Sequence, residues 1–325
     1  MAGPLTTKSA LASSGGPFEG FADADFRAYE PQKQGSMKFN LERRKAKDKL
    51  LALARAIHES LGSELVGLEL HASDETPSVK NGKKVEHQQA MFLRNAEGQK
   101  ALRSLTNTTN LQSGSAMFDI GLEHQHASLE IRLGLQGVSV GIEIAGRAKA
   151  DRDNVIEKLR QSWARDRVIE LAKELPAPAS LGMDGSLTPA EALTGEEVEG
   201  WIAAMATPKS LRAVTTIEPA DIVAFGASAV ESLGSTLRTY VPLYRFLAWS
   251  KDNEHAAVKE TIKKSTEERQ KKAIAFHPGD RVTILAGLFA GRAGYVAEID
   301  AKGMKAKVMV GPVSLSIESK DLKSA

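Results

Sequence analysis

The spacing of apolar residues predicts long helices in the first half of the chain. Over residues 40–61, leucine, isoleucine and alanine recur at intervals of three or four positions, and Gly62 follows. This spacing predicts an amphipathic helix that ends at Gly62, because glycine tolerates the backbone conformations that terminate helices. A similar pattern over residues 151–175 predicts a second amphipathic helix.

Between these helices the pattern changes to the shorter runs that are typical of strands. Residues 117–122, 127–135 and 138–144 are apolar runs with partial alternation, and we expect three consecutive strands there. Consecutive short strands favour antiparallel pairing. Residues 18–175 are therefore predicted to form an α/β domain with a mostly antiparallel sheet.

The second half of the chain differs in composition. Residues 176–200 contain prolines, glycines and acidic side chains, which are typical of a linker. Helical patterns follow, including a charged helix at 253–274. The predicted fold class is α+β multidomain, with a disordered leader (1–17), the α/β domain (18–175), an acidic linker (176–200), a helical region (201–275) and a small β-barrel (276–325).

The barrel is predicted from the last 50 residues, where short apolar runs alternate with glycines. Four or five strands in so short a segment bury a shared apolar face only by curling into a barrel. The motif within it is a Gly-Asp-basic-Val sequence followed by Gly-x-Phe-x-Gly-x-x-Gly-x-Val, in this chain Gly279-Asp280-Arg281-Val282 and Gly287 through Val296.

This segment resembles the KOW module, an SH3-like barrel of NusG-type transcription factors and several ribosomal proteins. The resemblance covers residues 277–322 and implies that Gly291 and Gly294 form a tight loop, with Phe289, Arg292 and Tyr295 displayed beside it. Such modules contact RNA, DNA, ribosomal protein or RNA polymerase. The alternative is that Phe289 and Tyr295 complete the barrel core. Three lysines on one hairpin are further candidates for phosphate contacts, namely Lys302, Lys305 and Lys307.

Composition and charge narrow the class of protein. Hydrophobic residues make up 42% of the chain and charged residues 26%, which is typical of a globular protein. The absence of cysteine excludes disulfides, thiolate zinc sites and cysteine nucleophiles. No apolar run reaches the roughly 18 residues of a membrane span, and the first residues lack a secretory signal, so we expect a cytoplasmic protein with no membrane partner.

The net charge of +2 rules out a chain-wide polycation, so any surface that binds nucleic acid must be a local patch. Outside the barrel, the best candidate for such a patch is the basic run Arg43-Arg44-Lys45 on the predicted helix. The alternative interpretation is an ordinary solvent-exposed helix face.

Two patterns in the N-terminal half are candidates for catalytic or metal-binding chemistry. Asp119, Glu130 and Arg132 are similar to the acid…Glu-x-Lys arrangement of restriction-type nucleases, with arginine in place of the lysine. Charges on a half-exposed strand explain the same residues. His124 and His126 lie on one face of an extended segment and could bind zinc or another transition metal, but exposed histidines near a turn are the favoured interpretation. We assign no catalytic residue, metal or cofactor.

A second resemblance covers the N-terminal half. Phe18-x-Gly-Phe, then Asp25-Phe26, and later Phe118-Asp119-Ile120-Gly121-Leu122 resemble the YktB-like family of uncharacterised bacterial proteins. This resemblance implies a fold and no activity.

Together these features predict a non-enzymatic protein that binds RNA or DNA, or docks on RNA polymerase or the ribosome, through its C-terminal barrel. The alternatives are a metal-dependent nuclease that the barrel targets, or a protein-interaction scaffold.

Overall fold

The computed structural model describes residues 16–78, 81–106, 125–253, 276–285, 289–300 and 305–324. It is a mixed structure of helices and sheets, as the sequence predicts, and the chain divides into two compact units, residues 1–255 and 256–325. Residues 1–15 of the predicted leader, the predicted strand 117–122 and residues 254–274 of the predicted charged helix lie outside the described residues.

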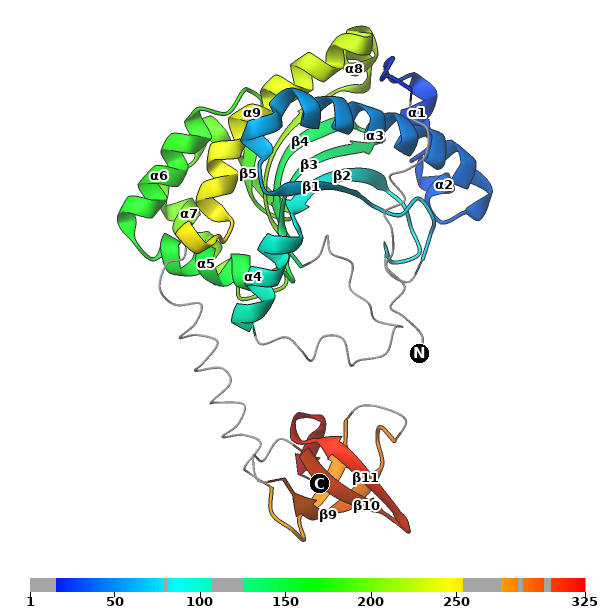
Figure 1. Cartoon of the computed structure of the whole chain (residues 1–325), viewed down its shortest axis with the longest axis vertical. Helices are drawn as coiled ribbons and strands as arrows, with labels where there is room; N and C mark the ends of the chain where they lie inside the picture. The colour runs from blue at the N-terminus through cyan, green and yellow to red at the C-terminus, as the bar shows by residue number, and fades with distance from the viewer. Residues whose placement is uncertain are drawn as a thin grey trace. The chain divides into compact units, whose positions relative to one another are not determined.

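The first unit contains a seven-stranded sheet with the spatial order β1-β2-β3-β4-β7-β5-β6 (Figure 1). Every neighbouring pair is antiparallel, so the predicted antiparallel sheet is confirmed. The strands are β1 (Leu68–Ala72), β2 (His87–Arg94), β3 (Ala127–Gly134), β4 (Gly137–Ile144), β5 (Ala179–Met183), β6 (Ser186–Pro189) and β7 (Leu211–Ile217).

The helices of this unit include two long ones, and α3 coincides with the helix predicted over residues 40–61. Gly62 caps it with a positive φ of 31°. The helices are α1 (Asp23–Arg27), α2 (Pro31–Gln34), α3 (Asn40–Leu61), α4 (Ala96–Thr106), α5 (Lys149–Leu159), α6 (Ser162–Lys173), α7 (Gly195–Ala204), α8 (Pro219–Phe225) and α9 (Ala229–Leu247).

Alternation along the strands places the apolar side chains on one face of the sheet, and α3 and α9 pack against that face (Figure 1). On β3, Leu129, Ile131 and Leu133 all lie in this core and are fully buried. Burial of such side chains stabilises the fold by roughly 1.5–3 kcal/mol each. The intervening residues of β3 therefore face the opposite side of the sheet.

The structure differs from the sequence analysis between residues 176 and 217. The segment predicted as a linker contains β5, β6 and the start of α7, and β7 follows in the region predicted to be helical. Strands β5 and β6 were missed because they are short and contain a glycine and a proline, and because their apolar side chains find partners only in the assembled sheet. The start of α7 carries a capping box between Thr194 and Glu197, and this Thr-x-x-Glu spacing is a helix-start signal that the sequence contains.

Two helix boundaries also differ from the prediction. The helix predicted over 151–175 is divided into α5 and α6. The residues at 242–249 predict a separate helix that begins at Pro242, but Pro242 lies inside α9. A proline inside a helix costs about 3 kcal/mol. The continuous apolar face of α9, with Leu237, Tyr240 and Val241 buried in the core, offsets that cost.

The second unit contains a curled, five-stranded half-barrel sheet with the order β11-β10-β9-β8-β12 (Figure 1). A small core of its own lies inside the curl and includes Val282, Val296 and Val308. The strands are β8 (Arg281–Ile284), β9 (Ala293–Ile299), β10 (Lys305–Val310), β11 (Val313–Glu318) and β12 (Leu322–Ser324).

Across the ranges that the structure describes, no helix combines the length and apolar character needed to span a bilayer.

A buried ion pair fixes the C-terminal end of α9 to the sheet. The guanidinium of Arg94, at the end of β2, donates to both carboxylate oxygens of Asp151 on α5. Arg94 also donates from Nε and Nη2 to the carbonyl of Trp249, at 3.1 and 2.8 Å. Asp151 in turn accepts from the backbone N–H groups of Ala127 and Trp249, both at 2.8 Å. One carboxylate thus joins β2, β3, α5 and the residues after α9.

We expect Asp151→Ala to lower the free energy of unfolding by about 3–5 kcal/mol, because it leaves the charge of Arg94 buried and unpaired. The matched control is Asp153→Ala on the same helix, which breaks an ion pair whose lysine, Lys149, is exposed, and should cost less than about 0.5 kcal/mol. Urea denaturation followed by tryptophan fluorescence measures both, since Trp163, Trp201 and Trp249 all lie in the first unit. Equal losses in the two variants would contradict this role of Asp151.

Candidate functional site

The outer face of the half-barrel carries an exposed tyrosine between a cation and a methionine. Tyr295 on β9 lies directly opposite Arg281 on β8 and opposite Met309 on β10. The tyrosine is 55% exposed and Arg281 is also exposed, whereas the next residue on β9, Val296, is buried in the core. The pleat of β9 therefore displays the ring of Tyr295 to solvent beside a permanent positive charge.

The turn between β8 and β9 adds a second aromatic side chain and a second arginine. Phe289 is 38% exposed, Arg292 is exposed, and the N–H of Arg292 donates to the carbonyl of Phe289 at 3.0 Å. Gly291 lies in this turn with a φ of +82°, a conformation that favours glycine. Exposure of both aromatic side chains contradicts the alternative that Phe289 and Tyr295 complete the barrel core.

The predicted position of Gly294 in a tight loop is wrong. It lies in strand β9 and not in the loop that the resemblance implies. A Cβ atom there would lie 2.6 Å from the carbonyl oxygen of Met309 and 2.7 Å from a methyl group of Val308. Glycine is therefore needed at this position because β9 and β10 approach closely, and not because of a tight turn.

The lysines of the same unit are less available for phosphate contacts than the arginines. Lys305 and Lys307 are exposed on β10, but Glu318 lies opposite the first and Glu298 opposite the second. Opposite charges on neighbouring strands reduce the local positive potential. Lys302 lies outside the described residues.

The three residues of the basic run on α3 differ in burial: Arg43 is buried, whereas Arg44 and Lys45 are exposed. Arg43 is fully buried and donates to the carbonyls of Lys33, Ser36 and Glu75, as well as to the side chain of Asn40. The prediction that Arg43 binds phosphate is therefore corrected, because its guanidinium binds backbone oxygens within the protein.

Arg44 and Lys45 remain exposed on α3. Two adjacent cations are a small patch, and Glu42 and Asp48 lie within one helical turn of them. The outer face of the half-barrel is therefore the stronger candidate for a binding surface.

A second candidate site lies on the face of the seven-stranded sheet that α3 and α9 leave uncovered. Glu130 and Arg132 share that face of β3, as the alternation predicts, but Glu130 is only 1% exposed. The interpretation of these residues as charges on a half-exposed strand is therefore wrong. Nη2 of Arg132 donates to both carboxylate oxygens of Glu130, at 3.0 and 3.2 Å, and to Glu143 on β4 at 2.8 Å.

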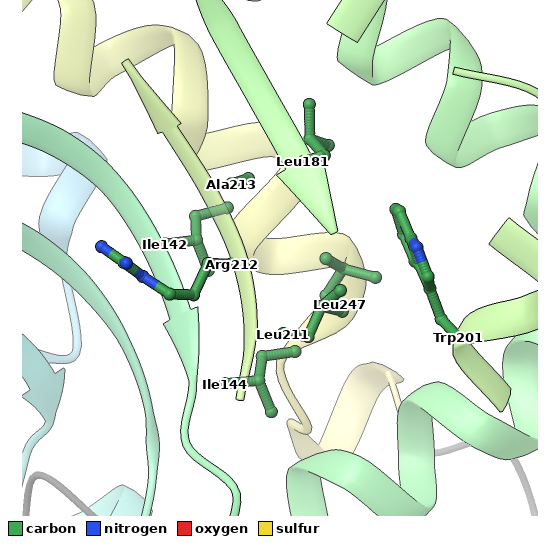
Figure 2. Close-up of a pocket in the computed structure, with 8 residues that line it drawn as sticks. All are labelled: Ile142, Ile144, Leu181, Trp201, Leu211, Arg212, Ala213 and Leu247. Atoms are coloured by element: carbon green, nitrogen blue, oxygen red, sulfur yellow. The ribbon is translucent and has the colours of Figure 1, made fainter. Parts of the chain in front are cut away.

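Arg212 joins this group from β7, two strands away from β3. Its Nη2 lies 3.5 Å from Oε1 of Glu130, and Figure 2 shows its side chain pointing away from Trp201 and Leu181. The strand between them carries Gly141 opposite Glu130. A Cβ atom on Gly141 would lie 1.9 Å from the carbonyl oxygen of Ala213, so glycine is needed here because β4 and β7 approach closely. We call Glu130, Arg132, Glu143 and Arg212 the charged cluster.

The two carboxylates of the charged cluster have opposite pKa shifts. Burial alone would raise the pKa of Glu130, but the charges of Arg132 and Arg212 outweigh it and lower that pKa. Burial, together with the negative charge of Glu130, raises the pKa of Glu143. Burial and the nearby Arg132 lower the pKa of His87, on β2, to about 4. At neutral pH, Glu130 is therefore ionised, His87 is neutral, and Glu143 accepts a proton more readily than an ordinary glutamate.

These contacts do not support a metal site of the nuclease type. The oxygens of Glu130 accept from Arg132, Arg212 and Gln89, so a cation would have to displace a guanidinium to reach them. Asp119 lies outside the described residues, and within the described ranges no group of three or more His, Asp or Glu side chains is arranged to hold a metal.

Of the predicted histidine pair His124 and His126, only His126 lies within the described residues. His126 is 4% exposed and its Nδ1 lies 3.4 Å from Nη1 of Arg94, which contradicts the prediction of an exposed histidine. His124 lies outside the described residues.

The core side of β7 holds a small apolar cavity, shown in Figure 2. Its volume is about 10 Å³, which is at most the space of one water molecule. It is a packing defect and not a ligand pocket. The lining residues are Ile142, Ile144, Leu181, Trp201, Leu211, Arg212, Ala213 and Leu247.

The pKa of His87 predicts a pH dependence of stability. Its folded pKa of about 4 lies below the unfolded value of about 6.5, so the unfolded chain binds a proton that the folded chain does not. Stability is therefore present above pH 6.5 and is lost as the pH falls towards 4. Between pH 7 and 4.5 we expect the wild type to lose roughly 2 kcal/mol more unfolding free energy than His87→Gln. Urea titrations at several pH values measure this difference, and parallel profiles would contradict it.

Comparison with known proteins adds no relative: no protein-family model matches the chain, and no curated protein matches it significantly.

Proposed function

We propose that this protein binds single-stranded RNA through the outer face of its C-terminal half-barrel and performs no chemistry there. The observation that carries the proposal is the exposed ring of Tyr295 directly opposite Arg281. An aromatic face on a strand stacks with a nucleobase, and an arginine beside it binds the adjoining phosphate. The resemblance of this segment to the KOW module, an SH3-like barrel, supports the same partner.

The residues of the β8–β9 turn extend this surface. Phe289 and Arg292 repeat the combination of an exposed aromatic side chain and a guanidinium, and Arg292 directly precedes β9. Stacking on an aromatic side chain contributes about 1–3 kcal/mol per base and tolerates any base. The proposed binding is therefore of limited sequence specificity.

The charges of the surface predict a weak dependence on salt. Arg281 lies opposite Tyr295 and Arg292 is exposed in the turn before β9, whereas Lys305 and Lys307 lie opposite Glu318 and Glu298. About two phosphate contacts give a slope of about −1.4 in a plot of log affinity against log salt. From 50 to 200 mM salt the affinity should then fall about sevenfold.

A protein partner, such as a component of the transcription or translation machinery, is the second candidate. Tyrosine and arginine are the residue types most enriched at the centres of protein interfaces, and Met309 beside Tyr295 adds apolar area. Association that is insensitive to salt and to nuclease treatment would favour this candidate over RNA.

The test is binding of a labelled 12-nucleotide single-stranded RNA to the full chain, measured by fluorescence anisotropy. We expect Tyr295→Ala to weaken binding about tenfold and Tyr295→Phe to preserve it, because phenylalanine keeps the stacking ring. Arg281→Gln should reduce the magnitude of the salt slope by about 0.7.

The control is Arg167→Gln on α6, which removes an exposed arginine of the first unit and should leave binding unchanged. Equal affinity of Tyr295→Ala and the wild type would refute the proposal, and so would an equal loss in the Arg167 control.

A further inference from the structure

Strand β11 lies at one edge of the half-barrel sheet (Figure 1). It pairs with β10 along its whole length without a bulge, from Glu318 opposite Lys305 to Val313 opposite Val310. Among the strands that the structure describes, β10 is its only neighbour. In an antiparallel pair, alternate residues direct their N–H and C=O groups away from the partner strand. The outer edge of β11 therefore presents backbone donors and acceptors with which another strand can pair.

The apolar face of the half-barrel extends to this edge. On β10, Ala306 and Val308 are fully buried in the small core. Their cross-strand partners on β11, Ile317 and Leu315, are only partly buried, and Val313 is 44% exposed. Burial of the core-side residues thus decreases from β10 to β11. A further strand on this edge would cover apolar side chains that the five strands leave partly exposed.

Strand β11 lacks the features by which edge strands usually avoid pairing with another chain, namely charged side chains, proline and bulges. Residues 313–317 read Val-Ser-Leu-Ser-Ile and contain neither a charged residue nor a proline. The one charge of the strand, Glu318, lies at its C-terminal end. An open, uncharged edge beside a partly exposed apolar face fits an added β-strand.

We propose that β11 pairs with β11 of a second copy of this chain and forms a symmetric dimer. The two strands are antiparallel, with Leu315 opposite Leu315 of the second copy and Val313 opposite Ile317. Residues that lie opposite each other share a face of the sheet, so this register gathers the three apolar side chains of each strand on the core side. Each copy contributes the same edge, so the assembly closes at two chains.

The strand is complementary to itself in charge, which favours a second copy as the occupant. In this register Glu318 of the second copy lies opposite position 312. The two Glu318 carboxylates are therefore six residues apart along the strands, which is about 20 Å, and salt screens exposed charges over about 8 Å. On the outer face, Ser314 lies opposite Ser316 of the second copy. Small neutral side chains thus meet across the interface, and no like charges oppose each other.

The dimer leaves the proposed RNA-binding surface accessible, because Tyr295 lies on β9, two strands away from the edge. Each dimer carries two copies of that surface, and binding of one RNA strand to both raises the effective concentration at the second. This consequence rests on the proposed function, whereas the dimer itself does not.

The test is sedimentation velocity of the full chain, without RNA, over a hundredfold range of concentration up to about 200 μM. We expect a reversible equilibrium between monomer and dimer with no larger species, because the pairing is closed. Hydrogen–deuterium exchange at the lowest and highest concentrations locates the interface. The amides of residues 313–318 should exchange more slowly at the highest concentration, because pairing protects them.

Two double variants with the same positions changed provide matched controls for each other. Ser314→Glu/Ser316→Glu opposes like charges twice across the proposed interface, whereas Ser314→Lys/Ser316→Glu opposes unlike charges twice. Both serines are exposed, and Ser316 faces Lys307 of its own chain, so both variants should fold. We expect the dissociation constant of the dimer to be at least tenfold higher for the Glu/Glu variant than for the Lys/Glu variant. Circular dichroism verifies that both are folded.

Three results would overturn the proposal. The first is a wild type that remains monomeric over the whole range, which would leave a strand of another protein as the occupant of the edge. The second is equal dissociation constants for the two folded double variants. The third is a dimer whose concentration-dependent protection lies outside β11. None of these measurements uses RNA, so failure of this proposal and failure of the RNA-binding proposal are distinguishable.

Discussion

The carboxylate of Asp151 is the interaction on which the first unit most depends. It accepts hydrogen bonds from Arg94 and from two backbone N–H groups, those of Ala127 and Trp249. These groups belong to the end of β2, the first residue of β3 and the segment after α9, which are far apart in the sequence. A buried charge is tolerated only when it is fully paired. The pair therefore specifies how α9 ends over the sheet, in addition to any stability it provides.

Helices α3 and α9 cover one face of the sheet, and the charged cluster lies on the opposite face. Alternation along the strands places one set of apolar residues under α3 and α9. The opposite face is mixed, because the buried Met91 lies on it beside Glu130. On that face, β4 and β7 approach closely at Gly141, and the long side chains of Arg132 on β3 and Arg212 on β7 both reach Glu130. The charged cluster is thus a consequence of strand order and register.

Local patterns in the sequence predicted a large part of this fold. The helix over 40–61 and the strands at 127–135 and 138–144 were found because a single period of apolar residues determines each of them. Strands β5 and β6 were missed because their apolar residues have partners only in the assembled sheet. The same reason applies to the charged cluster: Glu130 and Arg132 are two residues apart, but Arg212 is brought to them by strand order, which no local pattern encodes.

The two candidate sites use arginine under opposite physical conditions. On the half-barrel, Arg281 is exposed and its interaction with an anion is screened by salt. In the charged cluster, the guanidinium groups are withdrawn from water, so the same charge interacts more strongly and is more costly when unpaired. Apolar residues of similar size would fill that face of the sheet without leaving unpaired donors, and such replacements are often neutral or stabilising. The cluster is therefore weak evidence for stability, and its two unpaired Nε donors add to its cost.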